Sequence, residues 1–229
     1  MHTITVIHPS RGRAQMAFNA YKMWRQNAHT DFQYILSVDN DDAHNYWKGP
    51  FCDLQDGNAL MTMNDNKSAI EAINVAVQHA TGDILIVISD DFLCRPNWDI
   101  NMLRMLDRFE GTDYLVKTDD GLQPTLVTLP ILGRGYYERF GYIYHPGYKH
   151  MFCDQEMTAV AIMTDKYIKL PLKFEHAHYT TGAMQKDLIN IKNDATWNQG
   201  EDLFNERLKS NFGLKPEEIV KSYQEIVWR

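Results

Sequence analysis

Two adjacent carboxylates at the end of an apolar run are the residues best suited to chemistry in this sequence. Residues 84–88 are all apolar, and Ser89, Asp90 and Asp91 follow them directly. Such a short apolar run is typical of a strand buried on both faces in a parallel sheet. Neighbouring carboxylates favour a cation between them, and open α/β sheets bind ligands at this end of their strands. The residues indicate a site for a metal ion and a phosphate, although such pairs also occur in turns and helix caps.

Polar residues also follow the two earlier strands that the sequence predicts. Residues 3–8 are mostly β-branched and predict a first strand, which ends in a loop with Arg11 and Arg13. Two arginines beside a strand end suit an anion or a nucleotide, but they are also consistent with an ordinary basic turn. The second predicted strand, residues 32–38, ends at Asp39. That carboxylate could accept hydrogen bonds from a ribose or a base, or form a polar turn.

Two pairs of residues in the second half are further candidates. Asp154 and Glu156 lie in the first turn of a predicted helix over residues 154–163. The helix dipole stabilises acidic residues in that turn, so the two residues could equally have a purely structural role. His176 and His178 are two residues apart. In an extended segment they would share one face and could ligate a metal.

The order of the predicted elements places these residues on an α/β scaffold. Helical periodicity over residues 14–28 and 68–80 alternates with the predicted strands, which include a short third strand at residues 58–63. Repeated strand–helix units predict a mostly parallel central sheet flanked by helices on both faces. Residues 43–58 lack a clear period and are expected to form a loop, whereas residues 125–132 are expected to form a further strand.

The length of 229 residues suits one large domain. We expect a nucleotide-binding half over residues 1–92, an acceptor and metal half over residues 93–185, and a helical tail over residues 186–229.

An aromatic, glycine-rich stretch interrupts the second half at residues 133–142. It suits a platform for a sugar or a nucleoside, and equally the packing at a sheet edge. Arg134 and Arg139 lie in this stretch and could bind DNA or a phosphate-bearing acceptor. A solvated loop with an aromatic anchor is the simpler interpretation.

Composition restricts the partners and the compartment. The formal charge is −7, from 23 basic and 30 acidic residues, so the surface has no general attraction to nucleic acid or anionic membranes. A local basic cleft remains compatible with this charge. Cys52, Cys94 and Cys153 show no metal-binding or redox spacing, which favours reduced thiols and a cytoplasmic protein. No apolar run approaches the length of a membrane helix, so no membrane insertion is expected.

The order of these signals is more specific than any one of them. Residues 68–74 are followed by Ala80-Thr-Gly-Asp83, by the apolar run and by the aspartate pair. This arrangement resembles the nucleotide-sugar glycosyltransferases of the Rossmann-like GT-A fold, nearest to glycosyltransferase family 2. The resemblance covers residues 3–92 well and residues 130–180 loosely.

For the nucleotide, the resemblance implies a set of binding residues. Pro9, Ser10 and Arg11 would lie along the base and the ribose. Asp39 would bind the nucleobase, typically uracil, and Lys67 would lie near the nucleotide.

For the metal, the resemblance implies Mg²⁺ or Mn²⁺ bound by Asp91 and bridging the two phosphates, with Asp90 supporting the metal or the ribose. His176 or His178 would complete the metal shell. Ser89 occupies the position of the first acid of the family's Asp-x-Asp motif, which weakens the role of Asp90.

For catalysis, Asp154 would be the general base of an inverting enzyme, with Glu156 as the other candidate. Arg11 or Arg13 could stabilise the leaving diphosphate through charged hydrogen bonds. The residues alone leave an inverting and a retaining mechanism both open.

The expected function is therefore metal-dependent transfer of a single sugar from a nucleotide-sugar donor, most simply a UDP-sugar, to an unidentified acceptor hydroxyl. The acceptor could be a lipid-linked sugar, a protein, a small metabolite or a nucleobase in DNA, so nucleic acid is not excluded. The alternatives are a nucleotidyltransferase of similar topology and a non-catalytic module that binds a nucleotide or a sugar.

Overall fold

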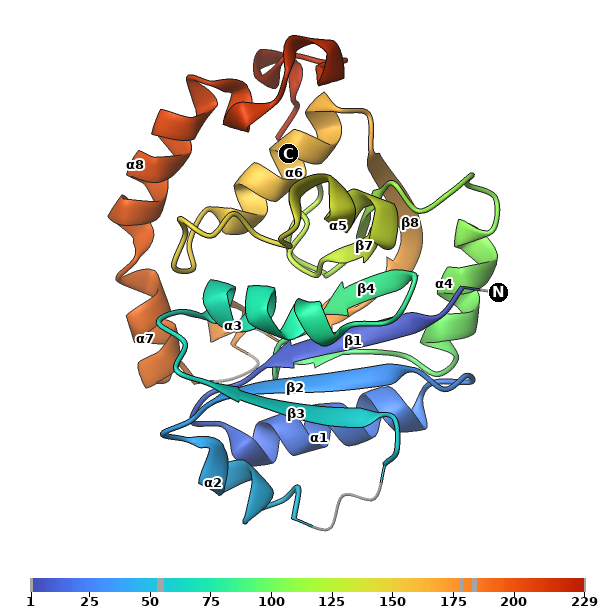
Figure 1. Cartoon of the computed structure of the whole chain (residues 1–229), viewed down its shortest axis with the longest axis vertical. Coiled ribbons are helices and arrows are strands. Elements are labelled where there is room, and N and C mark those ends of the chain that lie inside the picture. The colour runs from blue at the N-terminus through green and yellow to red at the C-terminus, as the bar shows by residue number, and fades with distance from the viewer. Residues whose placement is uncertain (1, 53–55, 178, 183–184, 229) are drawn as a thin grey trace.

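The computed structural model describes residues 2–52, 56–177, 179–182 and 185–228. The first half alternates strands and helices (Figure 1). Its elements are β1 (Ile4–Pro9), α1 (Ala14–Gln26), β2 (Gln33–Asp39), α2 (Ala43–Trp47), β3 (Ala59–Asn64), α3 (Ala69–Ala76) and β4 (Ile84–Val87). The second half contains β5 (Phe92–Leu93), α4 (Trp98–Leu106), β6 (Leu115–Asp119), β7 (Ile131–Gly133), α5 (Arg134–Phe140), α6 (Cys153–Met163), β8 (Tyr167–Lys173), β9 (Glu175–His176), α7 (Leu188–Asp194) and α8 (Trp197–Leu208).

The main sheet has seven strands in the order β3-β2-β1-β4-β7-β6-β8, and β5 pairs with β9 in a separate two-stranded sheet. The four strands of the first half run parallel to one another, whereas β7 is antiparallel to both of its neighbours. Because the carboxyl ends of parallel strands meet at one edge, the residues that follow β1, β2, β3 and β4 converge there. This confirms the predicted mostly parallel α/β sheet.

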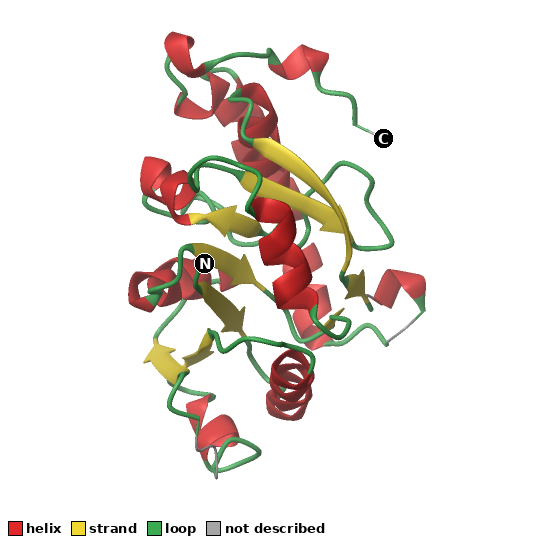
Figure 2. Cartoon of the chain, turned by 90° about the vertical axis from the view of Figure 1, so that its right-hand side faces the viewer, coloured by secondary structure: helices red, strands yellow, loops and turns green. Residues whose placement is uncertain are grey.

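Helices cover both faces of this sheet, as Figure 2 shows. Alternate residues of β4 point to opposite faces: Ile84 and Ile86 pack in one core with α1 and α4, and Leu85 and Val87 pack in another with α3 and α6. A strand buried on both faces needs apolar residues at every position, which explains the unbroken apolar run.

Gly82 is required by packing between neighbouring strands. A Cβ at this position would lie 2.6 Å from the backbone nitrogen of Thr5 in β1. The Gly82 N–H also donates to the Thr5 hydroxyl, at 2.9 Å. The missing side chain therefore allows the chain to enter β4 directly beside β1.

The structure corrects three predictions from the sequence. Residues 43–58 were expected to form a loop, but α2 begins there. Within the predicted strand at 125–132, only residues 131 and 132 are in a strand, β7. The aromatic stretch at 133–142 was interpreted as a solvated loop with an aromatic anchor. It contains the helix α5 instead, and its Tyr136 is buried. None of the helices in the described part of the chain is long and apolar enough to cross a membrane.

Candidate active site

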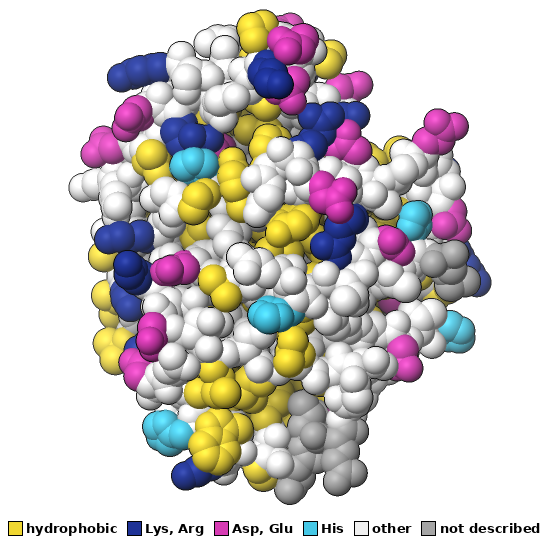
Figure 3. Space-filling model, in the orientation of Figure 1, with side chains coloured by type: hydrophobic (Ala, Val, Ile, Leu, Met, Phe, Trp, Pro, Cys, Tyr) yellow, Lys and Arg dark blue, Asp and Glu magenta, His cyan; other side chains and the backbone are white. Residues whose placement is uncertain are grey.

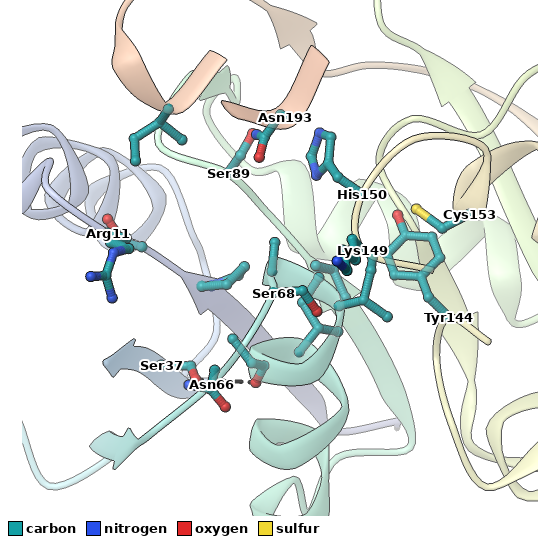
Figure 4. A pocket seen from close by; sticks show the side chains of 18 of the residues that line it. Arg11, Ser37, Asn66, Ser68, Ser89, Tyr144, Lys149, His150, Cys153 and Asn193 are labelled. Atoms are coloured by element: carbon teal, nitrogen blue, oxygen red, sulfur yellow. Dashed lines mark hydrogen bonds between the residues drawn. The ribbon is translucent and has the colours of Figure 1, made fainter. Parts of the chain in front are cut away.

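A cleft of about 720 Å³ opens at the carboxyl edge of the parallel strands. One wall consists of the residues after β1, β2, β3 and β4, and the other is formed by the segment before α6 and by α7. In Figure 4, Arg11, Ser37 and Asn66 lie on the first wall, whereas Tyr144 and Lys149 lie on the second. Of the predicted site residues that the structure describes, all but Glu156 line this cleft: Pro9, Ser10, Arg11, Arg13, Asp39, Lys67, Ser89, Asp90, Asp91, Asp154 and His176.

Asp91 lies beside the imidazole of His176. Its side chain is 7% exposed, and its Oδ2 lies 3.4 Å from Nε2 of His176. Its other oxygen accepts a hydrogen bond from the Ser89 hydroxyl. Burial opposes ionisation, but the His176 and Ser89 contacts outweigh it and hold the pKa of Asp91 below its usual value. Pairing of β5 with β9 places His176 opposite Phe92, and the two rings stack.

Asp90 has a different environment from Asp91. One of its oxygens lies 3.0 Å from Nε2 of His8 and accepts a hydrogen bond from Ser10 at 2.8 Å. The other lies 3.7 Å from Arg13. Nδ1 of the fully buried His8 lies 2.6 Å from the hydroxyl of Tyr34. These contacts fix Asp90 against the loop that follows β1, so it orients this loop.

A cluster of opposite charges lies at the end of β2. Arg11 forms ion pairs with Asp39 and Asp41. Asp39 also accepts a hydrogen bond from Asn66 at 2.9 Å. Asp39 is therefore held at the cleft wall by the loops that follow β1 and β3.

The start of α3 is fixed on the same wall. Ser68 caps the helix by accepting a hydrogen bond from the Glu71 N–H, and the Glu71 carboxylate accepts one from the Lys67 N–H. The cap holds the backbone of Lys67 at the edge of the cleft.

Arg13 joins this wall to the C-terminal segment. Its guanidinium donates two hydrogen bonds to Asp187, at 2.7 and 2.8 Å, and one to Asn190 at 3.2 Å. Asp187 is also the N-cap of α7, whose residues Asn190 and Asn193 line the cleft. Sequence reasoning gave the tail no role in the site, since nothing local links Arg13 to a residue 174 positions away.

Asp154 lies in the first turn of α6 and faces the cleft. Burial raises the pKa of Asp154 to about 6, from an ordinary value of 3.8. A carboxylate with such a pKa can accept a proton near neutral pH.

The structure does not bring Glu156 to the cleft. Its carboxylate is buried, binds Arg207 through hydrogen bonds of 2.7–3.0 Å and accepts one from Tyr148 at 2.7 Å. Glu156 thus joins α6 to α8.

His178 lies outside the described residues. Among the residues that are described, no group of three or more His, Cys, Asp or Glu side chains is arranged to hold a metal ion by itself. The arginines of the aromatic stretch also have structural partners: Arg134 donates to the carbonyls of Ala80 and Gly82, and Arg139 pairs with Asp113.

Comparison with protein families gives one match, between residues 49–125 and the family described as Glycosyl transferase family 2. This segment includes β3, α3, β4 and the Ser89-Asp90-Asp91 motif. A search of curated protein sequences gives no significant match.

Solved structures of similar fold extend the likeness beyond that segment. A mannosyltransferase from Pyrobaculum calidifontis, in complex with GDP-Man and Mn²⁺, aligns with a TM-score of 0.61 at 16% identity, over 77% of this chain and 57% of its own. GalNAc-T7 with UDP, GalNAc and Mn²⁺ aligns with a TM-score of 0.63 at 13% identity, over 77% of this chain and 43% of its own. Glucosyl-3-phosphoglycerate synthase from Mycobacterium tuberculosis, with Mn²⁺, UDP and glucosyl-3-phosphoglycerate, aligns with a TM-score of 0.60 at 12% identity, over 83% of this chain and 75% of its own. The present chain thus spans about half the length of the first two proteins.

Proposed function

We propose that the chain transfers one sugar from a nucleoside diphosphate sugar, with UDP as the expected leaving group, to an acceptor hydroxyl. Residues 49–125 match the family described as Glycosyl transferase family 2, and the fold is similar to that of solved glycosyltransferases. The observation that carries this proposal is the convergence of Asp39, Asp91 and Asp154 on one cleft. The groups that we propose to bind the nucleotide, to hold the metal ion and to act as the base therefore line the same cleft.

The nucleoside would lie along the wall formed by β1, β2 and β3. Asp39 supplies an acceptor for a donor group of the base, and its position is fixed by Arg11 and Asn66. The loop from Pro9 to Arg13 lies beside it, oriented by Asp90.

Asp91 and His176 fit a divalent metal ion. A carboxylate oxygen and an imidazole nitrogen 3.4 Å apart could occupy neighbouring positions around Mn²⁺ or Mg²⁺. The lowered pKa of Asp91 keeps it ionised, as a ligand must be. A bound divalent ion would neutralise charge on the departing diphosphate.

Asp154 would act as the general base. Its carboxylate would take the proton from the acceptor hydroxyl while that oxygen bonds to the anomeric carbon and the bond from this carbon to the diphosphate breaks. The proposal therefore implies an inverting reaction. Transfer also needs water to be kept from the sugar, and α7, held by Arg13, would cover one side of the cleft.

The test is a panel of UDP-, GDP- and dTDP-sugars incubated with the protein and Mn²⁺, with mass spectrometry of the released nucleotide. Release from at least one donor that is lost in Asp91→Asn supports the proposal. The proposal fails if no donor is cleaved, or if Asp91→Asn cleaves donors as fast as the unmodified protein.

A further inference from the structure

The acidic side chains on the nucleotide side of the cleft have partners within it. Arg11 pairs with Asp39 and Asp41, Arg13 lies beside Asp90, and His176 lies beside Asp91. Each of these four carboxylates therefore has a basic partner within the protein.

Three lysines that line the cleft are different. The amines of Lys67, Lys149 and Lys192 form no ion pair or hydrogen bond with any residue that the structure describes. The diphosphate of the donor would be balanced by the divalent ion that the proposed function requires. These three amines are therefore available to an anionic ligand.

Lys149 is the best placed of the three, because the segment that carries it is anchored at both ends. Asn74 of α3 binds the backbone of Tyr144 through hydrogen bonds of 2.7 and 3.3 Å. The Met151 N–H donates to Thr196 at 3.2 Å. The residue before Lys149 is the buried Tyr148, whose hydroxyl donates to a carboxylate of α6. The backbone of Lys149 is thus fixed, while its side chain remains exposed to the cleft.

The same segment leads into the proposed base. In Figure 4, Lys149 lies between Ser68 and Tyr144, and Cys153, which precedes Asp154, is on the same wall. The helix that begins here, α6, has no side-chain cap, and Asp154 lies in its first turn. Figure 3 shows both basic and acidic side chains along the edge of the molecule where Figure 1 places α7 and α8.

We propose that the acceptor of this enzyme is an anion, a hydroxyl compound bearing a phosphate or a carboxylate group, and that Lys149 binds this group. The inference rests on the proposed function, since it assigns the substrate class of the same cleft. The Lys149 ammonium would hold the anionic group on the α6 wall and thereby bring a hydroxyl of the same molecule to Asp154.

Anion binding can be measured without knowing the acceptor. We would titrate ¹⁵N-labelled protein, free and saturated with UDP and Mg²⁺, with methylphosphonate, acetate and neutral acetamide, and follow the backbone amides of residues 149–154. The expected result is a saturable shift with methylphosphonate, acetate or both, and none with acetamide. Which anion binds more tightly distinguishes a phosphate acceptor from a carboxylate acceptor.

Variants separate this site from the donor site. Lys149→Ala should weaken anion binding about tenfold, as expected for one charged hydrogen bond, and Lys149→Arg should retain it. Lys209→Ala, at an exposed lysine outside the cleft, should change nothing. UDP affinity, measured in the same samples, should be equal in all variants. The inference would be overturned if no anion bound, or if binding did not shift the amides of residues 149–154. A loss of UDP affinity in Lys149→Ala would also overturn it, because this lysine would then belong to the donor site. If UDP itself does not bind the unmodified protein, the proposed function fails separately.

Discussion

Replacing Asp154 with Asn should make the protein more stable and nearly inactive at the same time. The carboxylate faces a cleft in which burial raises its pKa from 3.8 to about 6. Ionised Asp154 is therefore strained in the folded state, whereas the amide carries no charge to desolvate. Loss of a general base typically lowers turnover by 10²–10⁴-fold.

The size and the sign of the stability change follow from the pKa. A shift of about two units corresponds to ~3 kcal/mol, and solvent in the cleft should reduce this to ~1–2 kcal/mol. Because the folded pKa is raised, the folded state holds its proton longer than the unfolded state. The cost of ionised Asp154 thus begins as the pH rises past about 4 and is complete above about 6. The variant should gain stability at pH 8 and gain none below pH 4.

Urea unfolding at pH 8 and pH 4, with turnover assayed from pH 5 to 8, tests both effects. For the unmodified protein, kcat/KM should rise through a pH of about 6 and then level off. Asp202→Asn, at an exposed position of α8, is the matched control and should alter neither property. Equal stability of Asp154→Asn and the unmodified protein at pH 8 would refute the electrostatic argument, and near-normal turnover would refute the role of Asp154 as base.

Substitutions at three further positions test other parts of the account. Glu156→Gln should lower the free energy of unfolding, measured in urea, by about 3–5 kcal/mol, because it leaves Arg207 without its buried ionic partner. The UDP affinity of the folded protein should not change. Arg13→Ala should weaken UDP binding by about tenfold in calorimetry, because it frees α7 from the loop that follows β1. Arg13→Lys should restore little of this affinity, since a lysine cannot reproduce two parallel hydrogen bonds to Asp187. Full affinity in Arg13→Ala would contradict the role of this contact. Gly82→Ala should cost about 1–3 kcal/mol in thermal unfolding, because its Cβ would lie 2.6 Å from the backbone of β1; an unchanged melting temperature would show that the strands move apart freely.

The parallel half of the fold was predictable because its signals are local. The apolar run of β4 requires burial on both faces, and β-branched residues mark β1. The short helices α2 and α5 were missed, since five and seven residues give too few turns for a helical period to emerge.

The candidate site was predictable only where strand ends determine it. Asp39 and Asp91 follow parallel strands, so topology alone brings them to one edge. Asp154 and Glu156 both lie in the first turn of α6, and residues two apart on a helix cannot face the same way. The contact with Arg207, far away in the sequence, holds Glu156 away from the cleft, and Asp154 faces it.

His8 was overlooked although it carried a signal. An imidazole in a strand of apolar residues must find polar partners when it is buried. The structure supplies Tyr34 and Asp90, and these contacts place Asp90 apart from the proposed metal ligands.

The central claim is that Asp91 holds a divalent ion on which nucleotide binding depends. Calorimetric titration of UDP, and then of GDP, into the protein with and without Mn²⁺, repeated with Asp91→Asn, tests it most directly. The account predicts binding that requires both the metal and Asp91. Nucleotide binding of equal strength without Mn²⁺ or with Asp91→Asn, or binding of neither nucleotide, would contradict it.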